Sequence, residues 1–376
     1  MKIGIVTEYY YPLLGGITEN VHNTMIRLIE MGHEVKIITS KCCGRCRLIT
    51  VDSHSLYSPN LIRMGHSVPI YSNGSFAHLT VGIGLRADLR KILEREKFDL
   101  LHIHSPLVPT LPLIALFEAT CCVVGTFHTY FDRNLVYGVL KEVIQEKALS
   151  RLDGQIAVSK SCIDALSRTF KLNPRIIPNG VDTRRFSPNV PRLERFDQSK
   201  MNLFFLGRLD PRNGLSLMFR AFDIVKSEFP KVRLIIGGDG PLRPYYKAFI
   251  PRSLAGDIHL VGPILGQRTR YYATCDVFCS PVEKASFGVT LLEAMASGKP
   301  IVATANRGYE ALLGPEEGFL VPLGDPRAFA RSILNLLRDE QLRTNMGLNG
   351  RIKALRYSWD HVAGEIAAYY EELLRR

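Results

Sequence analysis

The chain has 376 residues, a formal net charge of +12 at pH 7 and 46% hydrophobic residues. This length exceeds the usual size of one domain, and the composition is that of a globular protein, which excludes a disordered chain and favours two domains. The first residues are apolar only for the length of a strand before Glu8, and the most apolar stretch, 105–127, is interrupted by prolines. We therefore expect neither a signal peptide nor a membrane-spanning helix, and predict a cytoplasmic protein.

Charge and cysteine content restrict the partners. The positive charge favours an anionic partner, such as nucleic acid, a phospholipid surface or a nucleotide phosphate. The sequence has no zinc-finger spacing and no aromatic RNA-binding motif, so we expect no nucleic-acid partner. Cys43 and Cys46 have a C-x-x-C spacing without a second pair nearby, so we expect reduced thiols and no metal site.

Strands and helices alternate through the first half of the chain. An apolar strand at 2–7 is followed by a glycine turn and by a helix with Thr18 as its N-cap and Gly32 as its end. Because strands that alternate with helices form right-handed βαβ units, we predict a mostly parallel sheet. Its further strands are expected at 34–39, 98–104, 122–128, 154–159 and 176–182.

The same alternation restarts after the segment 187–200, which is rich in proline and charge and reads as a linker. We predict an α/β protein with two Rossmann-like, doubly wound domains, at 1–190 and 191–358, and a last helix at 359–376 that returns to the first domain. Doubly wound sheets bind ligands at the carboxyl ends of their strands, so we expect the site in a cleft between them. Strands of the second domain are expected at 202–208, 232–238, 258–263, 277–281, 300–304 and 318–322.

Two candidate residues lie at strand ends of the first domain. Gly16 follows Gly15 in the turn after the first strand, where backbone N–H groups at a helix N-terminus suit a phosphate. The spacing is not the G-x-G-x-x-G of dinucleotide-binding proteins, and a plain turn also uses glycine. His128 ends the strand 122–128 at the edge where catalytic groups collect, although a single histidine is more often structural.

Two turns of the second domain carry candidate phosphate ligands. Arg208 and Arg212 lie in the turn after strand 202–208, and a guanidinium forms paired hydrogen bonds with phosphate oxygens. Ordinary solvated arginines in a surface turn are the alternative. In the glycine-rich turn 236–241, Asp239 is either a ligand or a helix cap.

The segment 286–293 predicts an anion site at a helix N-terminus. Phe287 and Gly288 precede a helix expected from Val289 to Ser297, whose first N–H groups suit a phosphate. Glu293 lies about one turn into this helix among apolar neighbours, and a carboxylate can accept hydrogen bonds from both hydroxyls of a ribose. The alternative role of Glu293 is a buried salt bridge or the cap of a neighbouring loop.

Seven motifs in one order resemble a known family. They are the GG turn followed by HEVKIIT, then GTFHTY, IAVSK, PNGVDTRRFSP, LGRLDPRNG, GGDGP and SFGVTLLEAMASGKPIVAT. Together they resemble the family-four retaining glycosyltransferases of GT-B fold, which include phosphatidylinositol mannosyltransferases and sucrose- and trehalose-type synthases. The resemblance implies a GT-B fold with an acceptor bound by the first domain and a sugar-nucleotide donor bound mainly by the second.

The resemblance also implies roles for the candidate residues. Arg208 would contact the donor diphosphate, Glu293 the ribose and His128 the transferred sugar. It implies no metal and no cofactor, because the arginine and the helix N-terminus stabilise the departing diphosphate. We assign catalysis to His128, Arg208 and Glu283, and donor binding to Gly16, Arg208, Arg212, Asn213, Asp239, Phe287, Gly288, Val289, Thr290 and Glu293.

Two positions depart from the family pattern. The family usually has two glutamates with seven residues between them, and counting back from Glu293 gives Ala285. Glu283 substitutes for the missing glutamate only if the turn is arranged differently. Asn213 stands where a lysine is common, and Arg212 is a candidate for the missing positive charge. The two losses conserve the charge of the pocket, which indicates either a coordinated variant or an altered donor or weakened catalysis.

We predict a retaining glycosyltransferase that moves a hexose from GDP-mannose or a UDP-sugar to a hydroxyl of a lipid or glycan acceptor. The alternative is a sugar-nucleotide-binding protein without turnover, and a nicotinamide-dependent enzyme is disfavoured by the absent glycine fingerprint. The basic loop 41–47 and the mobile-looking segment 66–76 are predicted to face the acceptor or an anionic membrane. The protein would then attach peripherally at the inner face of the membrane.

Overall fold

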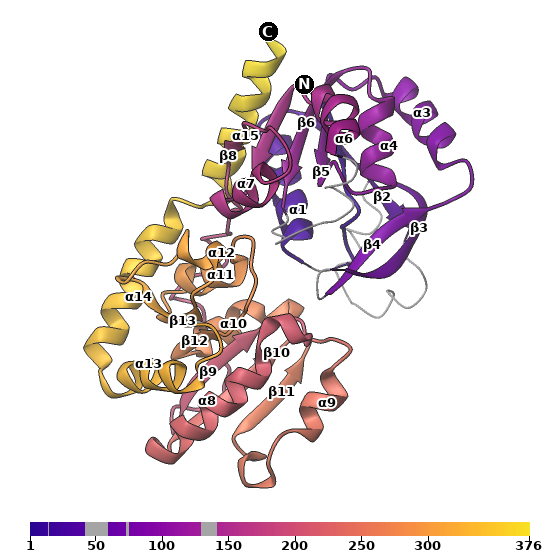
Figure 1. The fold of residues 1–376 in the computed structure, drawn as a ribbon. Helices are drawn as coiled ribbons and strands as arrows, with labels where there is room; N and C mark the ends of the chain where they lie inside the picture. Colours follow the sequence, from indigo (N-terminus) through magenta and orange to yellow (C-terminus); the bar gives the residue numbers. More distant parts are fainter. Residues whose placement is uncertain (14, 42–58, 73–74, 129–140) are drawn as a thin grey trace. The chain divides into compact units, whose positions relative to one another are not determined.

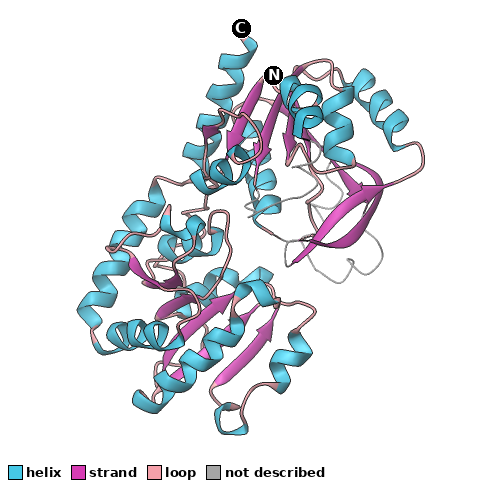
Figure 2. Cartoon of the chain, viewed as in Figure 1, coloured by secondary structure: helices cyan, strands magenta, loops and turns pink. Residues whose placement is uncertain are grey.

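The computed structural model describes residues 1–13, 15–41, 59–72, 75–128 and 141–376. They form two compact units, one made of Met1–Asn179 with Trp359–Arg376 and the other of Gly180–Ser358. Each unit is built on one sheet with helices packed against it (Figures 1 and 2). Among the described residues, no helix is long and apolar enough to cross a membrane.

The first unit contains an eight-stranded sheet in the order β4-β3-β2-β1-β5-β6-β7-β8. All neighbouring strands are parallel except β3 and β4, which form an antiparallel hairpin. Helices α1 and α15 bury apolar side chains against one face of the sheet, and α3 and α4 against the other. The helices and strands of this unit are β1 (Lys2–Val6), α1 (Gly16–Glu30), β2 (Glu34–Lys41), β3 (Leu61–Ser72), β4 (Ser75–Val81), α3 (Leu85–Glu96), β5 (Leu100–His104), α4 (Leu111–Glu118), β6 (Cys122–Phe127), α6 (Lys141–Lys147), β7 (Gly154–Ala157), α7 (Lys160–Ser167), β8 (Arg175–Ile176) and α15 (Trp359–Leu374).

The hairpin of β3 and β4 corrects one expectation. The segment 66–76, expected as a mobile-looking loop, supplies residues of both strands, with Pro69 opposite His78. Gly65 has a φ of +55° and approaches Thr80 so closely that a Cβ atom would lie 2.6 Å from its Cγ2, so this glycine serves strand pairing. Glycine and proline suggested a loop because their local preferences do not reveal pairing with a distant strand. The basic loop 41–47 lies outside the described residues apart from Lys41.

The C-terminal helix α15 completes the core of the first unit (Figure 1). The backbone N–H of Gln155 donates to the Tyr369 hydroxyl at 3.1 Å, and the Tyr370 hydroxyl lies 2.6 Å from Nδ1 of His102. Gly154 makes room for the helix, because a Cβ atom there would lie 2.4 Å from Cδ1 of Leu373. The helix expected at 359–376 therefore belongs to the first unit.

Replacing Tyr370 with phenylalanine is expected to lower the free energy of unfolding by about 1–2 kcal/mol. Tyr370 is fully buried, and without its hydroxyl the Nδ1 atom of His102 loses this hydrogen bond inside the core. Denaturant unfolding followed by circular dichroism measures the change. Tyr245→Phe, on the surface of the second unit, is the control and should change stability by less than about 0.5 kcal/mol. Equal stabilities of the two variants would contradict the bond to His102.

The second unit contains a six-stranded parallel sheet in the order β11-β10-β9-β12-β13-β14. Helices α8 and α13 bury apolar side chains against one face. Helix α11 contacts β12 and β13, and α14 packs on it. The helices and strands are β9 (Met201–Leu206), α8 (Leu215–Glu228), β10 (Val232–Gly237), α9 (Arg243–Ala248), β11 (Ile258–Gly262), α10 (Arg268–Thr274), β12 (Val277–Ser280), α11 (Val289–Ala296), β13 (Ile301–Thr304), α12 (Arg307–Glu310), β14 (Gly318–Val321), α13 (Pro326–Arg338) and α14 (Glu340–Leu355), with short 3₁₀ turns at Pro211–Asn213, Arg252–Leu254 and Leu265–Gln267. A further 3₁₀ turn, Leu149–Arg151, belongs to the first unit.

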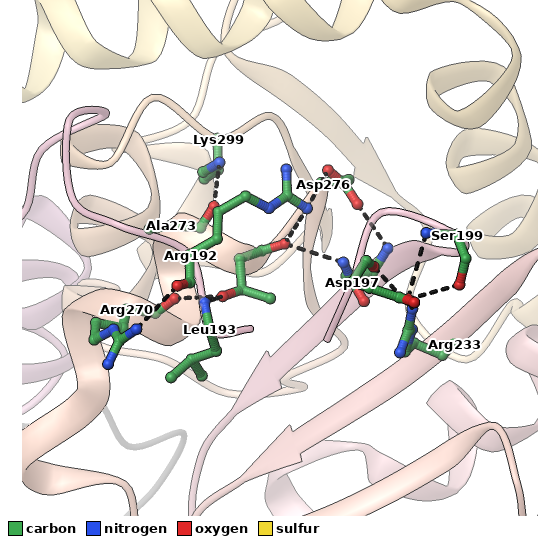
Figure 3. A network of polar contacts seen from close by, with 11 residues as sticks. Arg192, Leu193, Asp197, Ser199, Arg233, Arg270, Ala273, Asp276 and Lys299 are labelled. Atoms are coloured by element: carbon green, nitrogen blue, oxygen red, sulfur yellow. Dashed lines mark hydrogen bonds and ion pairs between the residues drawn. The ribbon is translucent and has the colours of Figure 1, made fainter. Parts of the chain in front are cut away.

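The segment 187–200, expected as a linker, is bound to the second unit through polar contacts (Figure 3). The Arg192 guanidinium donates to the carbonyl of Thr274 at 2.7 Å and to Oδ1 of Asp276 at 3.0 Å. The boundary between the units therefore follows Asn179 and lies earlier than the position near 190 that the sequence suggested. Composition marks this segment as irregular, but its contacts with a distant helix decide which unit holds it.

Candidate functional site

The turn after β9 carries Arg208 and Arg212 at the carboxyl edge of the second sheet. The Arg208 side chain is 44% exposed, and its Nε lies 3.9 Å from Oδ2 of the buried Asp210. Nε of Arg212 is buried and has no hydrogen-bond partner among the described residues. Nδ2 of Asn213 donates to the carbonyl of Arg208 at 2.8 Å. The turn therefore supplies two cations, and Asn213 stabilises its backbone.

A second turn, after β12, is joined to the first through the backbone. The N–H of Glu283 donates to the carbonyl of Arg212 at 3.1 Å, while the Glu283 side chain is exposed. Gly214 has a φ of +71°, and a Cβ atom on it would lie 2.0 Å from the carbonyl oxygen of Pro281. Only glycine fits this close approach. The two turns thus form one continuous edge.

Helix α11 begins at this edge. Gly288 precedes it with a φ of +121°, which favours glycine. Phe287 is buried, whereas Val289 and Thr290 are half-buried in the first turn of the helix. The first N–H groups of a helix have no acceptor within the helix and carry partial positive charge. This geometry suits a phosphate or another anion.

Helix α12 packs against the turn after β12, and the sequence did not predict this contact. A Cβ atom on Gly308 would lie 2.4 Å from the carbonyl oxygen of Ala285, so the helix backbone approaches the turn directly. The hydroxyl of buried Tyr309 lies 2.7 Å from Oγ of Ser280, and burial raises the pKa of Tyr309 to about 12. Gly308 was the available signal, because glycine is used where the backbone approaches another group closely.

Asp239 lies in the neighbouring glycine turn after β10. Its Oδ1 accepts the N–H of Gly240 at 2.9 Å and lies 3.7 Å from Nη1 of Arg243. The turn abuts the Arg208 turn, because a Cβ atom on Gly238 would lie 2.0 Å from the carbonyl oxygen of Gly207. Asp239 does not cap the following helix α9, whose N-cap is Leu242 with no side-chain cap, and its role as a donor ligand stays a prediction.

Glu293 lies in α11 and is 3% exposed. Its Oε1 forms an ion pair with Nη2 of Arg268 at 2.9 Å, and the Arg268 guanidinium lies 5.3 Å from the ring centre of Phe186. Burial, followed by the negative charge of Glu293, raises the pKa of Tyr272 well above its usual value. The buried salt bridge that the sequence left open is therefore present. Sequence reasoning missed Arg268, because nothing in the sequence around it indicates this distant partner.

Gly16 and His128 both belong to the first unit. Gly16 is exposed and is the first residue of α1, the helix that follows β1 in the chain. His128 follows β6 and is 8% exposed, and its Nε2 lies 2.7 Å from Nδ1 of His104 at the end of β5. Burial lowers the pKa of His128 to about 3, so the imidazole is neutral at pH 7.

The structure therefore groups the candidates by unit. The second unit brings together Arg208, Arg212, Asn213 and Glu283 with the start of α11, and the Asp239 turn abuts them. Glu293 is inside the unit and paired with Arg268. In the first unit, β5 lies between the strands that precede Gly16 and His128.

Comparisons with known proteins agree with both units. Residues 14–185 match the family described as Glycosyltransferase Family 4, and residues 200–339 match the family described as Glycosyl transferases group 1. A relative from Mycolicibacterium smegmatis, called phosphatidyl-myo-inositol mannosyltransferase, is 30% identical over 376 residues, which cover 99% of this chain and 94% of the relative.

Solved structures agree on the fold. Sucrose-phosphate synthase from Thermosynechococcus elongatus has a TM-score of 0.77 at 20% identity, with 100% of this chain and 99% of that chain covered. An Anabaena protein solved in complex with UDP and glucose has a TM-score of 0.75 at 20% identity, with 99% and 100% covered. The predicted GT-B class with Rossmann-like units is thus confirmed. The chain belongs to the family-four glycosyltransferases of GT-B fold.

Proposed function

We propose that this glycosyltransferase moves a hexose from GDP-mannose or a UDP-sugar to a hydroxyl of a lipid headgroup, with retention of the anomeric configuration. The edge formed by the Arg208 turn and the start of α11 carries this proposal, because it combines two arginines with the N-terminus of a helix. The mannosyltransferase from M. smegmatis, related over the whole length, favours mannose and an inositol lipid. A lipid acceptor requires contact with a membrane surface, to which the net charge of +12 is suited.

In this proposal the second unit binds the donor. Arg208 and Arg212 neutralise the diphosphate, and the N–H groups at 287–290 bind its oxygens. Glu293, oriented by Arg268, faces the ribose. Because these cations are fixed before the reaction, they stabilise the leaving diphosphate without a metal ion or another cofactor. Gly16 approaches the same diphosphate, and His128 the hexose.

The proposed reaction exchanges one bond at the anomeric carbon. The bond between this carbon and the diphosphate oxygen breaks, and the acceptor hydroxyl oxygen forms the new bond on the same face. The hydroxyl proton passes to the departing phosphate oxygen. The enzyme needs no carboxylate base for this step, which fits a site with Ala285 in place of the usual glutamate.

The two departures from the family pattern, Ala285 and Asn213, fit a coordinated change in the donor site. Asn213 is engaged with the Arg208 carbonyl, so it stabilises the turn instead of supplying charge. Arg212 supplies the cation from the preceding position. Glu283 is exposed on the turn that is hydrogen-bonded to Arg212, where its carboxylate is available to a sugar hydroxyl.

Thermal shift and transfer assays test the proposal together. The protein is mixed with GDP, UDP or ADP, and the matching sugar donor is then supplied with vesicles that contain phosphatidylinositol. We expect a raised melting temperature with one base, and a lipid product that keeps the donor's anomeric configuration by NMR, with and without EDTA. A shift without transfer to any acceptor would instead indicate a binding protein without turnover, and no shift would overturn the donor site.

Arg208→Ala is expected to lower kcat by about 100-fold, because it removes a cation that stabilises charge developing on the leaving diphosphate. Steady-state kinetics with the preferred donor measures the loss. Arg252→Ala replaces an exposed arginine of the same unit and should leave kcat unchanged. Equal rates for the two variants would show that the Arg208 turn does not contact the diphosphate.

A further inference from the structure

Three histidines are buried together at the ends of two neighbouring strands of the first unit. His102 and His104 come from β5, and His128 follows the adjacent strand β6. They are 1%, 2% and 8% exposed, respectively. The rings of His104 and His128 are inclined by only 14° with centres 5.0 Å apart, and the centres of the His102 and His104 rings are 4.3 Å apart. The cluster contributes to packing, and its hydrogen bonds indicate that it also has a second role.

Hydrogen bonds with neighbouring residues hold one end of the histidine cluster, at His102. His102 is held by the Tyr370 hydroxyl of α15 at Nδ1 and by Oγ1 of Thr126 at Nε2, both at 2.6 Å. Nδ1 of His104 lies 2.7 Å from Nε2 of His128. Nε2 of His104 is buried and has no hydrogen-bond partner among the residues that the structure describes.

All three rings are neutral at pH 7. Burial lowers the pKa of His102 and of His128 to about 3, and that of His104 well below its usual value. A neutral imidazole carries one N–H donor and one acceptor nitrogen. In the bond between His104 and His128, one ring therefore donates and the other accepts.

The environment of His104 decides which ring donates. A buried N–H without an acceptor is rarer in proteins, and more costly, than a nitrogen lone pair without a donor. The proton of His104 therefore lies on Nδ1 and not on the unpartnered Nε2. His104 then donates to Nε2 of His128, which leaves the proton of His128 on its Nδ1.

We infer that His104 is a positioning residue that holds His128 in the Nδ1–H tautomer, so that His128 presents a hydrogen-bond donor to the substrate. This inference rests on the proposed function only for the role of His128 near the hexose. Because the lone pair of Nε2 is occupied by His104, His128 is not a general base. Its partner on the substrate is an oxygen acceptor, such as a sugar hydroxyl oxygen.

Two near-isosteric variants test the role of His104. In His104→Asn the side-chain amide keeps an N–H donor near the position of Nδ1, whereas His104→Leu fills a similar volume without a donor. Long-range ¹H–¹⁵N spectra of histidine-labelled protein identify the tautomer of His128, assigned with His128→Gln. Transfer kinetics with the preferred sugar nucleotide are measured in parallel, and circular dichroism checks that each variant is folded.

We expect the wild-type spectrum to show His128 as the Nδ1–H tautomer, and His104→Leu to show a mixture of tautomers. The kcat of His104→Leu should fall by about 10–100-fold with little change in the KM for the donor, and His104→Asn should recover most of it. Between pH 6 and 8, kcat should show no ionisation of His128.

Two outcomes overturn the inference. An Nε2–H tautomer of His128 in the wild-type spectrum contradicts the assigned donor. Equal kcat losses in the Leu and Asn variants show that His104 acts through packing alone. If no sugar nucleotide supports transfer, the proposed function fails, while the spectrum still decides the tautomer.

Discussion

Replacing Gly214 with alanine is expected to lower the free energy of unfolding of the second unit by about 3–5 kcal/mol and to abolish nucleotide binding. The φ of +71° strains any residue with a side chain, and the new methyl group would lie 2.0 Å from the carbonyl oxygen of Pro281. Neither atom belongs to a flexible side chain, so the turns that carry Arg208 and Glu283 must separate. Denaturant unfolding and nucleotide thermal shift measure the two effects.

Gly256→Ala is the matched control for Gly214→Ala. Gly256 lies in the same unit, and a Cβ atom on it would meet nothing within 4 Å. This control should change stability by less than about 0.5 kcal/mol and keep the nucleotide shift. If Gly214→Ala also binds nucleotide with unchanged affinity, the close approach of the two turns is not required for the donor site.

Glu293→Ala should destabilise the second unit by about 3–5 kcal/mol, because it leaves the Arg268 guanidinium largely buried without its carboxylate. The two side chains are only 4% and 15% exposed, and removal of one member of a buried pair costs more than replacement of both. The double variant Glu293→Ala with Arg268→Met should therefore recover much of the lost stability. Denaturant unfolding of the single and double variants gives the coupling energy of the pair.

The double variant also separates the two roles of Glu293. If the carboxylate binds the ribose, the wild type should prefer the favoured nucleoside diphosphate to its 2′-deoxy form by about 10-fold, the effect of roughly one net hydrogen bond. The stable double variant should then show no preference. A preference that survives in the double variant would assign Glu293 to stability alone and leave recognition of the ribose to other groups.

Local patterns were enough for the fold class. The strand at 2–7 and the strand at 202–208 each show a short apolar run followed by a glycine-containing turn and an amphipathic helix. The observed β1 lies within the first range, and β9 begins one residue before the second. The start of α11 at Val289 was predicted from Gly288 and the apolar period after it. Such signals depend on residues within one turn or one strand, so a sequence carries them directly.

Other features depended on contacts between distant residues. The hairpin of β3 and β4 was hidden because Gly65 and Pro69 favour loops locally, while pairing with neighbouring strands stabilises the extended form. The boundary near 190 was misplaced because Arg192 binds residues more than 80 positions away. The sequence pattern around 187–200 does not indicate these long-range hydrogen bonds.

By itself, the sequence determined two α/β units of a glycosyltransferase fold and the strand ends that carry Arg208, His128 and the start of α11. Apolar period, glycine turns and motif order are local properties, and they are sufficient for that conclusion. Only the tertiary structure decided that Glu293 pairs with Arg268 and that His104 bonds to His128. A buried charge or ring takes its partner and its protonation from whichever distant groups folding places beside it, and those groups leave no mark on the neighbouring sequence.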